Sequence, residues 1–223
     1  YFQASPKYQT IIGEDVWDSY LGHGVIDYEK ALTAMRDFTA QRSQNTEDEL
    51  WILEHPPTYS MGLKTRTEHL PKNTPTIPLI QSDRGGQITY HGPGQIVTYA
   101  LFDLSRMKLS VRETIRLLEK TAINLLSSLG IQAHGDAARP GVYVGQRKIA
   151  SLGLKVRHGC SYHGVALNVD MDLKPFNEIE TCGYPELDVT QLKDLNVNLP
   201  IKEVAQRWAD QYLVSFSEPV VSG

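Results

Sequence analysis

Apolar residues recur along the chain at spacings that are typical of strands and of helices. Short runs rich in β-branched and aromatic residues predict strands at 8–12, 49–54, 95–104, 141–144, 147–157 and 162–169. Helical spacing predicts helices at 25–42, 110–129 and 201–216. The second helix has a defined start and end, because Ser110 and Glu113 form a capping-box pattern and Gly130 is a natural stop.

The order of these elements predicts the fold class. Several strands are joined by short turns, and helices do not alternate regularly with strands. We therefore expect an α/β (α+β) domain built on a mixed β-sheet, and not a doubly wound nucleotide-binding fold. We expect residues 4–223 to form a single domain and residues 1–3 to be the remnant of an expression tag.

Charge and cysteine content narrow the function classes. The net charge of -4 argues against general nucleic-acid binding, which usually needs an excess of basic residues. No apolar run is long enough for a membrane span and no apolar signal-like region opens the sequence, so we expect neither a membrane span nor a secretory signal. Two cysteines are too few for a disulfide framework, so we expect free thiols in a reducing compartment, the cytoplasm.

The segment RGGQITYHGPGQ at 84–95 places four glycines and a proline among Arg84, Tyr90 and His91. It precedes a predicted strand, whereas a phosphate-binding loop normally leads into a helix N-terminus, and neither common phosphate-binding fingerprint is present. A glycine-rich turn explains the glycines but not the three larger side chains. Because glycine lets the backbone approach a ligand, a binding pocket is the functional alternative.

Lys148 is a candidate proton carrier. In the predicted strand KIASLGLKVR, strict alternation places it on one face with four apolar residues, namely Ala150, Leu152, Leu154 and Val156. As a strand-end residue, Lys148 could extend its amine to water. If it is buried instead, the charged form is disfavoured, which suits a proton shuttle and a partner for a nearby thiolate.

Cys160 and Cys182 are both candidate nucleophiles. Cys160 lies in the turn HGCS between two predicted strands, and Cys182 lies in the irregular segment TCGYP. Either could be a small buried apolar residue. Reactive groups concentrate in loops on a rigid scaffold, which favours Cys182.

A metal site is a further candidate, which would involve one or both cysteines. His158, Cys160 and His163 form an HxCxxH cluster that Cys182 or His91 could join. Zinc sites usually contain two closely spaced ligand pairs, and the second pair is missing. We therefore expect neither a metal nor another cofactor.

Basic residues are concentrated between positions 137 and 160, where there is no acidic residue. They are Arg139, Arg147, Lys148, Lys155 and Arg157. This pattern fits either a solvated strand face or a docking surface for an acidic partner protein.

Four segments together resemble the lipoyl(octanoyl) transferases, which move an octanoyl group from acyl carrier protein to lipoyl domains. They are RGGQITYHGPGQ at 84–95, RKIASLGLKVR at 147–157, SYHGVALNVDMDL at 161–173 and TCGY at 181–184. Their order and spacing also agree, over a region from about residue 50 to 195. One departure is Thr181, where many members have proline before the catalytic cysteine.

The resemblance implies a mixed sheet flanked by helices, as in the lipoate and biotin protein ligases. It implies that Cys182 is the acyl-thioester nucleophile and that Lys148 favours its thiolate. Substrate contacts are implied for Arg84, Gly85, Gly86, Gln87, Ile88, Thr89, Tyr90, His91, Ser151, Leu152, Gly153, Gly164, Val165 and Ala166.

The implied partners are octanoyl-acyl carrier protein as donor, and as acceptors the lipoyl domains of 2-oxoacid dehydrogenases and the glycine cleavage H protein. Amides of the glycine-rich segments, together with His91, are candidates to stabilise the oxyanion. An ATP-dependent lipoate protein ligase and a non-catalytic acyl-binding module are the alternatives.

Overall fold

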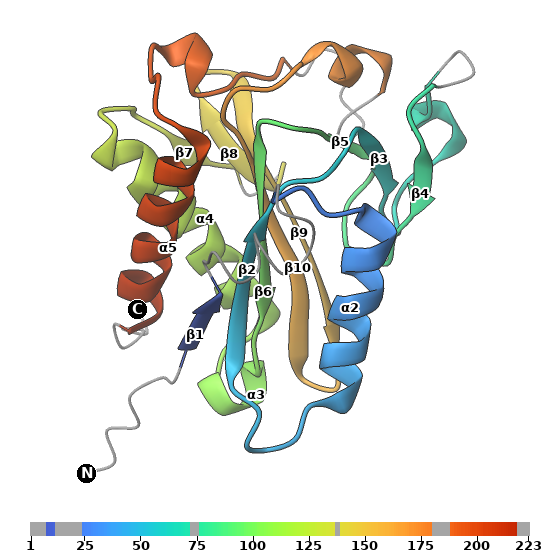
Figure 1. Cartoon of the computed structure of the whole chain (residues 1–223), viewed down its shortest axis with the longest axis vertical. Helices are drawn as coiled ribbons and strands as arrows, with labels where there is room; N and C mark the ends of the chain where they lie inside the picture. Colours follow the sequence, from blue (N-terminus) through green and yellow to red (C-terminus); the bar gives the residue numbers. More distant parts are fainter. Residues whose placement is uncertain (1–7, 12–23, 72–75, 137–138, 180–187, 218–223) are drawn as a thin grey trace.

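The computed structural model describes residues 8–11, 24–71, 76–136, 139–179 and 188–217. Its largest element is a seven-stranded sheet (Figure 1). In spatial order the strands are β1 (Tyr8–Ile11), β2 (Asp48–Leu53), β6 (Gln95–Leu101), β10 (Cys160–Asn168), β9 (Arg147–Arg157), β8 (Gly141–Val144) and β7 (His134–Gly135). The pair β1–β2 is parallel and the other pairs are antiparallel, so the predicted mixed sheet is confirmed.

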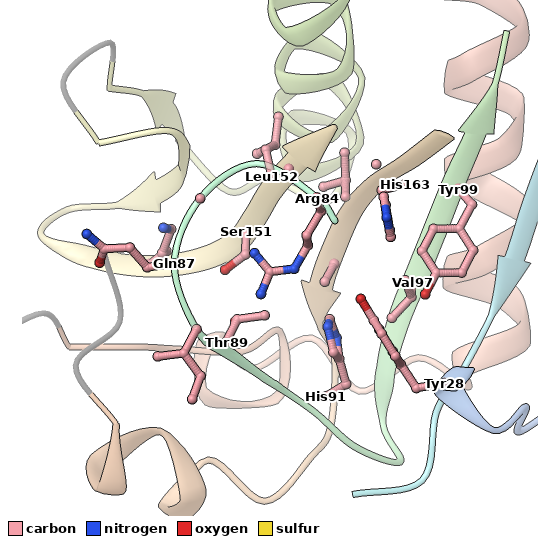
Figure 2. Close-up of a pocket in the computed structure, with 17 residues that line it drawn as sticks. Tyr28, Arg84, Gln87, Thr89, His91, Val97, Tyr99, Ser151, Leu152 and His163 are labelled. Carbon is pink, nitrogen blue, oxygen red and sulfur yellow. The ribbon is translucent and has the colours of Figure 1, made fainter. Parts of the chain in front are cut away.

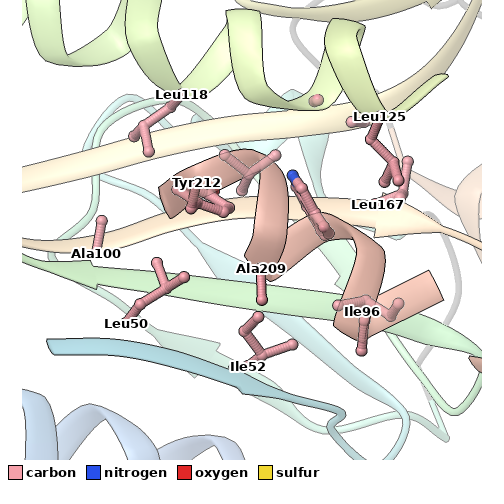
Figure 3. Packing of buried hydrophobic residues seen from close by; sticks show 14 of the residues in the cluster. Leu50, Ile52, Ile96, Ala100, Leu118, Leu125, Leu167, Ala209 and Tyr212 are labelled. Atoms are coloured by element: carbon pink, nitrogen blue, oxygen red, sulfur yellow. The ribbon is translucent and has the colours of Figure 1, made fainter. Parts of the chain in front are cut away.

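Helices cover both faces of this sheet (Figure 1). On one face, α4 (Val111–Ser128) and α5 (Ile201–Ser217) enclose the main core, in which the ring of Trp208 is fully buried. Figure 3 shows Tyr212 and Ala209 of α5 among residues from α4 and from the strands. On the other face, α2 (Tyr28–Gln41) packs on β6 and β10. The predicted helices at 25–42, 110–129 and 201–216 are therefore confirmed, with small differences at their ends.

Local sequence signals explain where several elements begin and end. The capping box of α4 forms as predicted, since Ser110 Oγ accepts from the Glu113 amide at 3.2 Å and Glu113 Oε2 accepts from the Ser110 amide at 2.7 Å. Strand β6 ends earlier than predicted because Asp103 caps the short helix α3 (Leu104–Met107).

A second sheet of three short strands was not predicted. Its order is β4 (Leu79–Gln81), β3 (Thr58–Met61) and β5 (Thr89–His91), so β5 lies within the glycine-rich segment 84–95. Strands of three or four residues are too short to show a period. This sheet packs on the 3₁₀ helix η2 (Lys174–Glu178), and the single-turn segments η1 (Thr67–His69) and η4 (Lys193–Leu195) complete the described elements.

None of the helices in the described ranges is long and apolar enough to cross a membrane.

Truncation of the buried ring in α5 should destabilise the whole domain. We expect Trp208→Ala to lower the free energy of unfolding by about 3–5 kcal/mol, because it leaves a cavity in the main core. Urea denaturation measures this change. The matched control is Val214→Ala on the same helix, where the side chain is 54% exposed and the expected change is below about 0.5 kcal/mol. Equal losses in the two variants would contradict this assignment of the core.

Candidate active site

One pocket contains most of the residues for which the sequence implied substrate contacts (Figure 2). These residues come from the loop before β5 and from β5 itself, from β9 and from β10, which are far apart in the sequence. They are Arg84, Gly86, Gln87, Ile88, Thr89, His91, Ser151, Leu152, Gly153, Gly164, Val165 and Ala166, and Lys148 lines the same pocket. Figure 2 shows Arg84 at the centre, with Ser151 on one side and His163 and Tyr99 on the other.

The glycines bring the loop against strand β9. The Gly85 amide donates to the Leu154 carbonyl at 2.9 Å. A Cβ at Gly153 would lie 2.9 Å from the Gly85 carbonyl oxygen, closer than real Cβ contacts allow. Gly86 has a positive φ of 83°, which L side chains rarely adopt. Glycine is therefore required for the close approach of two backbones here, and Gly85 itself does not line the pocket.

Arg84 is a buried cation that is held by neutral acceptors. Its Nε donates to Ser60 Oγ at 3.2 Å, its Nη2 donates to Ser60 O at 2.6 Å and to Ser60 Oγ at 2.9 Å, and its Nη1 donates to Gly85 O at 3.0 Å. No ion pair joins Arg84 to any carboxylate among the described residues. A guanidinium has five N–H groups, so these bonds leave one Nη1 N–H for a ligand oxygen.

Hydrogen bonds determine the tautomer of His91. The Gln95 amide nitrogen donates to Tyr90 O at 3.2 Å and to Asn168 Oδ1 at 2.9 Å, so Gln95 Oε1 must accept from His91 Nδ1, at 2.7 Å. Ser60 Oγ then donates to His91 Nε2, at 2.9 Å. Burial is the main reason that the pKa of His91 lies well below its usual value. The neutral ring has both nitrogens occupied, which removes it as an oxyanion donor.

The same network reaches the strand that carries Lys148. Asn168 Nδ2 donates to the Thr190 carbonyl at 3.0 Å, and the Thr190 amide donates to the Lys148 carbonyl at 2.9 Å. The Lys148 amide in turn donates to the Asp188 carbonyl at 2.8 Å. Through segment 188–190, hydrogen bonds therefore connect the side chain of His91 with the backbone of Lys148.

Lys148 is buried, at 2% exposure, but on the opposite face from the one that alternation predicted. Where β9 pairs with β8, Tyr143 is opposite Lys148 and Val142 is opposite Ala150, so Ile149 is an extra residue. Ile149 and Ala150 both pack in the main core, while Lys148 lines the pocket with Ser151. Successive side chains of a regular strand point to opposite faces of the sheet. The extra residue of this β-bulge therefore turns Lys148 to the face opposite the predicted one.

Tyr28 and Tyr99 also line the pocket and were not singled out in the sequence. The rings of Tyr28 and His91 stack with centroids 5.4 Å apart. His55, behind them, donates from Nδ1 to the Ile26 carbonyl at 2.5 Å and accepts from the Tyr99 hydroxyl at 2.6 Å. Both tyrosines lie in apolar segments, where periodicity alone indicates ordinary core positions. Val97 and His163 complete the pocket lining.

Tyr90, like Gly85, is an implied contact that lies outside the pocket, and the implied nucleophile cannot be placed. Tyr90 is absent from the pocket lining, and its ring packs edge-on against Phe176 of η2 with centroids 5.5 Å apart. It therefore supports the segment that precedes Cys182. Cys182 itself lies outside the described residues.

The HxCxxH residues have separate environments. His158 has a positive φ of 50° in the turn between β9 and β10, Cys160 is buried at the start of β10, and His163 Nε2 lies 2.9 Å from Asp83 Oδ1. Within the described ranges, no group of three or more histidine, cysteine or acidic side chains is arranged to hold a metal.

The chain is similar to known proteins in sequence and in fold. The family model of the lipoyl protein ligase A/B catalytic domain matches residues 27–213. An octanoyltransferase from Dechloromonas aromatica is 52% identical over 190 residues, which are 85% of this chain and 92% of that protein.

Solved structures share the fold at low sequence identity. A lipoate-protein ligase A bound with ATP has a TM-score of 0.67 at 17% identity, covering 86% of this chain and 82% of that one. A biotin protein ligase from Aquifex aeolicus in complex with biotin and ATP has a TM-score of 0.51 at 11% identity, covering 86% and 67%.

These matches confirm the predicted fold class, which is that of the lipoate and biotin protein ligase catalytic domain. The chain belongs to the lipoyl protein ligase A/B catalytic domain family. Its relatives at about 50% identity are octanoyltransferases, and it is an acyltransferase.

The buried histidines should make stability depend on pH. Burial lowers the pKa of His55 from 6.5 to about 4, so the unfolded chain binds more protons between these values. We expect the free energy of unfolding to fall by about 3 kcal/mol from this residue as the pH drops from 6.5 to 4, and to be unaffected by it above 7. Urea titrations at several pH values measure this. In a His55→Gln variant, the free energy of unfolding should fall less as the pH drops. The same pH dependence in the variant and the wild type would argue against a neutral buried ring.

Proposed function

We propose that this acyltransferase moves an octanoyl group from octanoyl-acyl carrier protein to the lysine of a lipoyl domain, through a thioester on Cys182. The observation that carries the proposal is the buried Lys148, which lines one pocket with the three glycine-containing segments. The octanoyltransferase relatives support the acyl group. This reaction would be the first step of endogenous protein lipoylation, and lipoyl domains of 2-oxoacid dehydrogenases and the H protein would be acceptors.

A backbone hydrogen bond of Lys148 supports its pairing with Cys182. Asp188, which accepts from the Lys148 amide, follows Cys182 by six positions in the chain. On the other side of Cys182, Ile179 is buried in the core under the small sheet. Both described ends of this segment are thus anchored next to the pocket.

The proposed chemistry has two half-reactions. The Cys182 thiolate attacks the thioester carbonyl, the carbon–sulfur bond to the carrier breaks, and the departing thiolate takes a proton from the Lys148 ammonium. The acceptor lysine then gives a proton to Lys148 and attacks the acyl-enzyme as an amine. Cys182 leaves as a thiolate, and the second amine proton passes to water.

Arg84 is better placed than His91 to stabilise the oxyanion of each tetrahedral intermediate. The remaining Nη1 N–H of Arg84 belongs to a buried cation that lines the pocket. Hydrogen bonds from a charged donor to a developing oxyanion are especially favourable when water is excluded.

The octanoyl tail would lie on the apolar part of the pocket. Val97, Leu152 and Ala166 provide this surface. Each methylene that leaves water contributes about 0.8 kcal/mol, so the length of this surface can set the preferred chain length.

An acidic carrier protein fits the basic residues near β9. Arg147 and Arg157 are exposed at the two ends of this strand, and Lys155 is half-buried between them. Opposite charges on the two proteins would speed their encounter.

Trapping the acyl-enzyme tests the proposal directly. With octanoyl-acyl carrier protein and no acceptor, intact-mass spectrometry should show one octanoyl adduct, and peptide mapping should place it on Cys182. Cys160→Ser is the matched control and should keep the adduct, while Cys182→Ser should lose it. The absence of an adduct on the wild type, or its survival in Cys182→Ser, would refute the mechanism. Pyrophosphate release from ATP and free lipoate would instead indicate a ligase.

Gly141 should be needed to position the lysine. A Cβ at Gly141 would overlap Lys148 Cε and lie 2.9 Å from the Ala150 carbonyl oxygen. We therefore expect Gly141→Ala to reduce acyl transfer by at least about tenfold, as small misplacements of catalytic groups are costly. Gly145→Ala in the same hairpin is the control, because it also has a positive φ but meets no atom within 4 Å. Similar activities of the two variants at equal stability would contradict the role of Lys148.

A further inference from the structure

His163 has a backbone conformation that turns its ring toward the pocket. In β10 the side chains of Val165 and Leu167 face the main core, so strict alternation would place His163 with them. Its φ of 64° is in the left-handed region, which is unfavourable for a residue in a strand. As a result, His163 points to the same side as Tyr162 and stacks on it, with ring centroids 5.1 Å apart. Strained backbone of this kind is found preferentially at functional sites.

Asp83 holds one nitrogen of the ring. His163 Nε2 lies 2.9 Å from Asp83 Oδ1, and the other carboxylate oxygen accepts from the Tyr162 hydroxyl at 2.8 Å and from Arg36 Nε at 3.0 Å. Burial alone would raise the pKa of Asp83, but the hydrogen bonds from His163, Tyr162 and Arg36 lower it below its usual value. An ionised carboxylate only accepts hydrogen bonds, so Nε2 carries the proton.

The other nitrogen of His163 is an acceptor without a donor in the described part of the chain. The Nδ1 atom is buried, the residue is 1% exposed, and the ring lines the pocket. Burial lowers the pKa of His163 even though Asp83 opposes this shift, so the ring is neutral and Nδ1 presents a lone pair. A buried acceptor without a partner is unfavourable, and such groups are rare in native proteins.

The pocket tyrosines do not satisfy this nitrogen. The Tyr99 hydroxyl donates to His55 Nε2 at 2.6 Å, and the Tyr28 hydroxyl donates to Ser82 Oγ at 3.0 Å. Each hydroxyl has a single proton, which these bonds use. No described group therefore supplies the donor for His163 Nδ1, and a substrate group that enters the pocket can supply it.

We propose that His163 is a substrate-contact residue whose Nδ1 accepts a hydrogen bond from an N–H group of the bound substrate. This inference rests on the proposed function. The octanoyl chain has only C–H bonds and a carbonyl oxygen, so it is not the donor. Two sources of N–H remain, namely the amide of the thiol arm that delivers the acyl group and the amine of the acceptor lysine.

Comparison of two thioesters in the first half-reaction tests the thiol arm. S-octanoyl-N-acetylcysteamine carries an amide N–H, and S-ethyl thiooctanoate does not. The rate of acyl-enzyme formation is measured for both, by intact mass, in the wild type, His163→Leu and His163→Asn. If the arm is the donor, the wild type should prefer the amide-bearing thioester by about tenfold, and His163→Leu should lose this preference.

His163→Asn is the matched variant. Asparagine tolerates a positive φ and its side-chain oxygen is an acceptor, so most of the preference should remain. Urea denaturation of both variants separates loss of stability from loss of contact, since instability alone would slow both thioesters equally.

The second half-reaction tests the acceptor amine. Acyl-enzyme formed in each protein is mixed with the lipoyl domain, and the rate of adduct loss is measured. If the acceptor amine is the donor, adduct loss should be about tenfold slower in His163→Leu than in the wild type. The rate in His163→Asn should be close to that of the wild type. Equal behaviour of all three proteins in both half-reactions would overturn the inference while leaving the proposed function intact. Failure of the wild type to form any acyl-enzyme would instead refute the proposed function.

Discussion

Two neighbouring strands of the large sheet break the alternation of their side chains, and the polar character of the pocket depends on this. In β9 the extra residue Ile149 turns Lys148 away from the main core, and in β10 the left-handed backbone of His163 does the same for its ring. Without these interruptions, regular alternation would direct both polar side chains toward the apolar layer under α4 and α5. The pocket wall between them is completed by the loop that carries Arg84.

Burying so many polar groups is favourable only when their hydrogen bonds are satisfied. The histidines at 55 and 91 achieve this by remaining neutral, with one nitrogen donating and the other accepting. The hydrogen bonds from Gln95 to Asn168 and from Asn168 to Thr190 extend the network around His91 to the backbone of Lys148. A change at His91 can therefore alter the position of the lysine without any direct contact between them.

Chain segments that are distant in sequence reach this site because the backbones approach each other closely. The contact between the loop and β9 needs hydrogen in place of a side chain at Gly153, and a Cβ at Gly85 would also lie close to the Leu154 carbonyl oxygen, at 3.3 Å. Tyr90 takes part differently, since its ring supports η2 and not the pocket. A motif that is contiguous in sequence thus divides into residues that face a substrate and residues that hold the scaffold.

The sequence by itself determined the mixed sheet, the bounds of β9 and the capped start of α4, because periodicity and caps are local signals. The segments that converge on one pocket were indicated by the family resemblance of their motifs. Only the tertiary structure decided the face of Lys148, the roles of Tyr28, Tyr99 and His163, and the small sheet around β3. A single inserted residue or one left-handed φ reverses the direction of a side chain, and neither leaves a trace in the pattern of apolar positions. The hydrogen-bond partners of a buried ring come from other strands and loops, so they exist only once the chain has folded.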